Sequence, residues 1–103
     1  MVEPVTYQVR IARRAQQDLR EIYEYIKVDS PRNAKGMIGR LLGDISRLSI
    51  LPHRYAVPRT FDVEGRDIRC MPVGNYLVYY RIEEAERKVR VISVQHGARR
   101  PRL

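Results

Sequence analysis

The sequence predicts an α+β domain in which an N-terminal strand precedes an antiparallel helix hairpin, and the hairpin packs on one face of a small antiparallel β-sheet (β-α-α-β-β-β). Two observations predict this class. Apolar residues recur at helical spacing between positions 12 and 52, and three short segments rich in β-branched and aromatic residues follow position 66. A chain of 103 residues is long enough for one hydrophobic core, so we expect a single domain over residues 1–103.

The first half of the chain changes from strand to helix periodicity at Ala12. Residues 5–11 alternate loosely, which predicts a half-buried strand, and the first amphipathic helix then ends near position 29. Ser30 and Pro31 are a favoured N-cap and first helical residue, so a second helix begins there and stops at residue 52. The short turn between the helices predicts an antiparallel hairpin. Three glycines weaken the second helix or allow it to approach the first closely: Gly36, Gly39 and Gly43.

The second half of the chain reads as a loop followed by three strands. Residues 53–67 predict a loop or an irregular edge, and strands are expected over residues 67–72, 76–83 and 89–96. A tight hairpin turn joins the first two of these strands, so the three form a meander. The N-terminal strand then lies either in the middle of the sheet or at its edge beside the last strand. The basic segment 97–103 is expected to be a mobile tail.

The charge of the chain restricts its partners. Lys and Arg number 20 against 12 Asp and Glu, which gives a net charge of +8 and favours polyanions or an acidic partner. One cysteine, Cys70, excludes an intrachain disulfide and is consistent with a reducing compartment. The chain shows no secretory signal and no apolar run of membrane-spanning length, so we expect a cytoplasmic protein without a membrane partner.

The candidate functional residues are basic side chains of the predicted sheet. Strand geometry allows Arg69, Arg81 and His96 to converge at one end or along one rim as a positive concavity with one imidazole. Such a set would supply a proton-transfer group and cations for metal-free RNA cleavage. The alternative is structural: Arg81 then pairs with a carboxylate, and His96 is capped at the end of its strand.

Motifs of other chemistries are absent from the sequence. It contains no Gly-rich phosphate loop, no HExxH, no nucleophile elbow and no paired Cys/His spacing. We therefore expect neither a cofactor nor a metal site.

Four sets of residues together resemble the RelE/ParE superfamily of bacterial toxins, the toxin halves of type II toxin–antitoxin operons. The resemblance spans about residues 5–100. The residues that carry it are Ala15, Asp18-Leu19, Ile22 and Tyr25-Ile26; Leu48 with Pro52; the hairpin from Arg69 through Gly74-Asn75-Tyr76, Val78 and Tyr80-Arg81; and His96-Gly97 with Arg99.

This resemblance implies a toxin, and the sequence favours its ParE-like branch. ParE-like members act on DNA gyrase, whereas RelE-like members cleave mRNA in the ribosomal A site. The segment 53–67 has no lysine and the chain has no terminal tyrosine, both of which favour a gyrase inhibitor that is not itself an enzyme. His96, with Arg69 and Arg81 as catalytic phosphate clamps, leaves a RelE-like endoribonuclease as the alternative.

The resemblance also implies partners. A cognate antitoxin with an acidic and apolar tail would neutralise the toxin in a hetero-oligomer, and the target would be gyrase or, alternatively, the ribosome and its mRNA. Arg69, Arg81, Arg99 and Arg100 are the expected target-binding or nucleic-acid-binding residues. A weaker alternative is a non-toxic nucleic-acid-binding domain that uses the same basic face.

Overall fold

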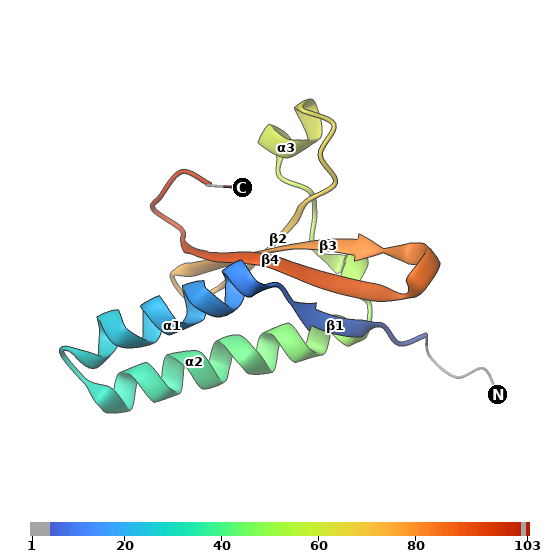
Figure 1. Ribbon diagram of the computed structural model, residues 1–103. Helices are drawn as coiled ribbons and strands as arrows, with labels where there is room; N and C mark the ends of the chain where they lie inside the picture. Colours follow the sequence, from blue (N-terminus) through green and yellow to red (C-terminus); the bar gives the residue numbers. More distant parts are fainter. Residues whose placement is uncertain (1–4, 102) are drawn as a thin grey trace.

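The elements of the fold follow the predicted order. The computed structural model describes residues 5–101 and 103, and Figure 1 shows their arrangement. Short 3-10 turns occur at Arg47–Ser49, Pro52–Arg54 and Glu84–Glu86. The strands and α-helices are β1 (Gln8–Ile11), α1 (Arg13–Lys27), α2 (Pro31–Ser46), α3 (Arg59–Val63), β2 (Arg69–Val73), β3 (Tyr76–Glu83) and β4 (Lys88–His96).

The four strands form one sheet in the order β1-β4-β3-β2. The predicted meander is confirmed, because β2 pairs with β3 and β3 with β4 in antiparallel fashion. Of the two positions expected for the N-terminal strand, the structure has the edge beside the last strand. There β1 runs parallel to β4, so the sheet is mixed, and it is antiparallel only over its last three strands.

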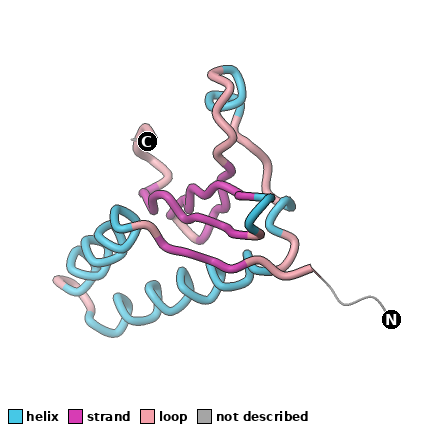
Figure 2. The backbone as a smooth tube through the Cα atoms, turned by 45° about the vertical axis from the view of Figure 1, so that its right-hand side comes forward, coloured by secondary structure: helices cyan, strands magenta, loops and turns pink. Residues whose placement is uncertain are grey.

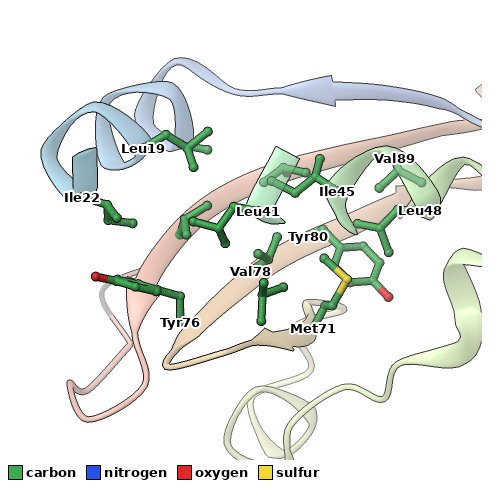
Figure 3. Packing of buried hydrophobic residues seen from close by; sticks show 14 of the residues in the cluster. Leu19, Ile22, Leu41, Ile45, Leu48, Met71, Tyr76, Val78, Tyr80 and Val89 are labelled. Atoms are coloured by element: carbon green, nitrogen blue, oxygen red, sulfur yellow. The ribbon is translucent and has the colours of Figure 1, made fainter. Parts of the chain in front are cut away.

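The helix hairpin covers one face of the sheet, as the apolar stripes predict (Figure 2). The α2 helix begins at the predicted N-cap, where the Ser30 hydroxyl accepts a hydrogen bond of 3.1 Å from the Asn33 backbone. Figure 3 shows side chains from both helices meeting those of the strands. The buried cluster contains Ala15, Leu19, Ile22, Leu41, Ile45, Leu48, Met71, Val73, Tyr76, Val78, Tyr80, Ile82, Val89, Val91 and Val94.

The glycines of α2 do not serve helix packing. A Cβ atom added at Gly36 or Gly39 would have no heavy atom within 4 Å, and one at Gly43 would meet only the Arg47 side chain at 3.9 Å. The expectation of a close approach to the first helix is therefore wrong. Within the fold, the three glycines lower the helix propensity of α2.

The opposite face of the sheet is covered in part by the segment that the sequence predicted as a loop. This segment contains the short helix α3, and its Phe61 ring packs edge-to-face on Tyr79 with ring centroids 5.7 Å apart. Ile68 completes this second buried cluster. Leu103, which falls in the segment expected to be a mobile tail, packs against the same cluster.

Where β1 ends, residues at the start of α1 bond to the edge of β4 in its place. The parallel pairing stops at Ile11 opposite Val91, and the Ala12 backbone N–H donates to the Val91 carbonyl at 2.9 Å. Further along, the Asp18 carboxylate accepts hydrogen bonds from the buried Ser93 hydroxyl at 2.6 Å and the Val94 backbone N–H at 3.0 Å. A side chain of α1 thus replaces a strand partner, and this contact fixes the helix against the sheet.

Replacing Asp18 by Ala should destabilise the fold by about 2–3 kcal/mol, because a charged acceptor is lost and two donors at β4 lose their partner. Asp18→Asn keeps one oxygen acceptor and should cost less. Urea denaturation monitored by circular dichroism measures both, with Asp29→Ala, an exposed carboxylate, as the control. Equal midpoints for Asp18→Ala and Asp29→Ala would contradict the assigned role.

Replacing Tyr80 by Phe should cost about 1–2 kcal/mol, since the buried Tyr80 hydroxyl donates to the Pro52 carbonyl at 2.6 Å. Burial also raises the pKa of Tyr80 from 10.0 to about 12. The folded state therefore keeps a proton that the unfolded state releases, and this contribution is complete below pH 10.0 and lost as the pH rises through about 12. Unfolding free energies measured across that range should fall more steeply for the unchanged protein than for Tyr80→Phe. Parallel pH profiles would exclude this role.

Candidate functional site

The helix hairpin extends beyond one end of the sheet (Figure 1). A large cleft lies between the hairpin and this end of the sheet. Its volume is about 1360 Å³, and its walls come from both helices, the β2–β3 turn and the end of β4. The lining residues are Arg14, Asp18, Glu21, Ile22, Tyr25, Ile26, Arg32, Asn33, Gly36, Met37, Arg40, Asn75, Tyr76, Val94, Gln95, His96, Ala98 and Arg99.

The cleft combines a positive rim with apolar surface. Four arginines line it against two carboxylates, and one of these carboxylates, that of Asp18, is already bonded to β4. Ile22 and Tyr76 are at most 9% exposed, whereas the Tyr25 side chain is 77% exposed. Such a surface suits an extended or helical peptide that carries both acidic and apolar side chains.

His96 and Tyr76 face each other across the β3–β4 ladder at this cleft. Their ring centroids are 5.5 Å apart in an edge arrangement, and the His96 Nδ1 accepts a 3.1 Å hydrogen bond from the Ala98 backbone N–H. That bond assigns the proton of the neutral imidazole to Nε2. Burial raises the pKa of Tyr76 above its ordinary value of 10.0.

Two glycines, Gly74 and Gly97, position the backbone next to the cleft residues around His96. Gly74 has φ +58° in the β2–β3 turn, a conformation that other residues rarely adopt. Gly97 approaches the same turn closely: its N–H donates to the Asn75 carbonyl at 2.8 Å, and an added Cβ would lie 3.3 Å from that oxygen. The end of β4 is therefore held against the β2–β3 turn.

The predicted convergence of Arg69, Arg81 and His96 is wrong. His96 is paired with Tyr76, and Arg81 lies five residues further along β3, roughly 17 Å at about 3.4 Å per residue. Arg69 is paired with Tyr80, so it lies on the helix-covered face, while Arg81 is exposed on the opposite face. No single phosphate group contacts all three.

The candidate arginines instead have separate surroundings. The Arg69 Nη1 donates to the Tyr55 carbonyl at 2.7 Å and the His53 carbonyl at 3.2 Å, so this side chain holds the segment before α3 against β2. Arg99 lines the cleft together with His96. Arg100 is exposed and is not among the lining residues.

The sequence prediction missed the cleft residues on the helices. Arg14, Arg32 and Arg40 were visible as polar helix positions, but their common cleft depends on how far the hairpin extends past the sheet. The alternation of exposed cations with Ile22 and Ile26 along these helices was the signal that could have indicated a mixed, partner-binding surface.

A second polar cluster ties the other end of the sheet together. Glu84 accepts a hydrogen bond of 2.9 Å from the Tyr7 hydroxyl and also contacts the His53 imidazole. These two hydrogen bonds lower the pKa of Glu84, and the bond to Glu84 raises the pKa of Tyr7.

Across the described part of the chain there is no group of three or more His, Cys, Asp and Glu side chains that could hold a metal ion. Within the same residues, no helix is long and apolar enough to span a membrane.

The fold and the comparisons with known proteins identify a toxin domain of the RelE/ParE superfamily. Residues 9–101 match the family described as ParE toxin of type II toxin–antitoxin system, parDE, and the chain belongs to this family. It is thus a ParE-like toxin component of a type II toxin–antitoxin system.

Several solved structures are similar to the chain, and two of them are toxin–antitoxin systems. One is the chromosomal ParDE system from P. aeruginosa, with a TM-score of 0.69 and 15% identity, covering 88% of this chain and 96% of that chain. The other is the toxin–antitoxin complex RelBE2 from Mycobacterium tuberculosis, with a TM-score of 0.59 and 26% identity, covering 89% of this chain and 99% of that chain. The search of curated proteins returned no significant match.

Proposed function

We propose that this toxin inhibits DNA gyrase and that its cognate antitoxin neutralises it by placing an acidic and apolar segment in the cleft. The observation that carries the antitoxin part is the cleft itself, which joins four arginines to apolar surface on one concave wall. Cations speed the encounter with an acidic segment, and buried apolar anchors supply affinity. The similar structures from P. aeruginosa and M. tuberculosis are toxin–antitoxin systems, which supports a partner of this kind.

Membership of the ParE toxin family supports gyrase as the target. The positions of the basic residues support it as well, because the three side chains expected to act on one phosphate lie apart. A gyrase inhibitor acts by binding and needs no such catalytic set.

The second candidate is a ribosome-dependent endoribonuclease. The exposed imidazole of His96 beside Arg99 favours it, since a proton-transfer group and a cation then share one cleft. The 26% identity with the RelBE2 complex points the same way. If the toxin is a nuclease, Arg99, rather than Arg69 or Arg81, is the cation that acts together with His96.

A supercoiling assay distinguishes the two candidates. Purified toxin is added to gyrase, ATP and relaxed plasmid, and we expect loss of supercoiling that added antitoxin reverses. His96→Ala should inhibit gyrase as strongly as the unchanged toxin. If saturating toxin leaves gyrase fully active, cleavage of mRNA in the ribosomal A site that is lost in His96→Ala would establish the nuclease instead.

A pair of glycine substitutions in α2 tests whether the antitoxin occupies the cleft. Gly36 lines the cleft and Gly39 does not, while neither position has a neighbour within 4 Å. Each change to Ala should stabilise the free toxin by up to about 1 kcal/mol through helix propensity. We expect Gly36→Ala to weaken antitoxin binding at least about tenfold, because its new methyl group separates the two surfaces.

Isothermal titration calorimetry with the antitoxin measures both affinities, and Gly39→Ala is the matched control. Equal affinities for the two variants would place the antitoxin on another surface.

A further inference from the structure

Three arginines form a straight row across the sheet. The parallel register pairs Arg10 of β1 with Arg90 of β4, and the antiparallel register pairs the same Arg90 with Arg81 of β3. Neighbouring strands lie about 4.8 Å apart, so the row extends about 10 Å across three strands.

The row lies on the face of the sheet that the helix hairpin leaves free. Residues on either side of each arginine point into the core beneath the helices, as Val89 and Val91 do for Arg90. Side chains alternate along a strand, so all three arginines point the other way. Each of the three is exposed. The cluster around Phe61 and Tyr79 covers a different part of this face.

The fold itself leaves this charge largely uncompensated. Arg90 Nε is paired with Glu83 Oε1 at 3.1 Å, but Arg10 and Arg81 have no ion pair or hydrogen bond from their side chains within the described residues. Like charges directly opposite each other on neighbouring strands destabilise a sheet. An external anion would relieve that repulsion.

The surroundings of the row favour a phosphate backbone over a peptide. On one side of the row, the adjacent positions on the same face are Gln8, Lys88 and Glu83, so the row has no apolar anchor there. On the other side, Ile92 follows Arg90 on this face and already packs against the cluster around Phe61. None of the three arginines lines the cleft proposed for the antitoxin. Arginine binds phosphate through paired N–H groups, and a DNA strand carries one phosphate per about 3.4 Å of helix axis. A row about 10 Å long therefore spans two or three phosphates.

We propose that Arg10, Arg90 and Arg81 form a binding strip for the phosphodiester backbone of a nucleic acid. The strip is separate from the antitoxin cleft and independent of whether gyrase is the target. It reads charge and spacing and not base sequence.

The test compares two double variants of equal net charge. Arg10→Gln with Arg81→Gln removes the two unpaired members of the strip, and Arg20→Gln with Lys35→Gln removes two exposed cations from the helices. Antitoxin-free protein is titrated against fluorescein-labelled duplexes of DNA and of RNA, with fluorescence anisotropy recorded over a range of salt concentrations. Circular dichroism verifies that every variant is folded.

The strip predicts a specific salt dependence. Each phosphate contact contributes about −0.9 to the slope of log K against log salt for DNA, so the strip double variant should have a slope shallower by about 1.8 and bind at least about tenfold more weakly at low salt. The helix double variant should change the slope little. Glu83→Gln removes the one carboxylate from the strip and should tighten binding more than Glu24→Gln on α1.

Several outcomes would overturn the proposal. Equal losses of nucleic-acid affinity in the two double variants would show that binding depends on net charge and not on the strip. Unchanged affinity in both variants would show that the three arginines do not bind nucleic acid. Normal nucleic-acid binding together with weakened antitoxin binding in the strip variant would assign the row to an acidic peptide. Comparison of the titrations with DNA and with RNA shows which of the two nucleic acids the strip binds. A salt slope that becomes shallower in the strip double variant, with either nucleic acid, supports the proposal.

Discussion

The unpaired edge of β4 is the constraint on which the rest of the structure depends. Strand β1 is only four residues long, so past Val91 the edge of β4 that faces away from β3 has no strand partner. Buried backbone groups need partners, and the Asp18 carboxylate on α1 supplies one for the Val94 N–H. This bond places α1 along the line that a longer β1 would have taken. Because α2 packs on α1, it also directs the whole hairpin past the end of the sheet, and the cleft is formed there.

The excess positive charge is used differently in three places. The Arg69 guanidinium bonds to backbone carbonyls and holds the segment before α3, so it acts within the fold. The cleft arginines stand beside apolar surface, which matches a peptide partner. The row of Arg10, Arg90 and Arg81 stands on an open, polar part of the sheet and matches a polyanion. A net charge of +8 alone does not distinguish these three uses; the neighbours of each arginine do.

Sequence reasoning succeeded where the signal was local. The bounds of β3 and the capped start of α2 follow from alternation and from Ser30-Pro31, which act over a few residues. The parallel pairing of β1 and the register shift between Tyr79 and Tyr80 depend on contacts distant in sequence, and these decide which side chains meet. The separation of His96 from Arg81 was missed because alternation assigns a face but not a position along the sheet. Helix α3 was missed because its five residues are too few to show a period.

The pairing of Gln8 with Lys88 joins β1, the first element of the described chain, to β4, the last one. The walls of the cleft likewise combine helices from the first half of the chain with His96 and Arg99 near its end. Contacts this distant in sequence need the long intervening chain to close, which costs conformational entropy and slows folding. During translation, therefore, neither the parallel edge nor the cleft exists until the last strand has been synthesised. The cell that makes this toxin meets its complete binding surface only after β4 and Arg99 have been synthesised, and a product truncated before them would lack it.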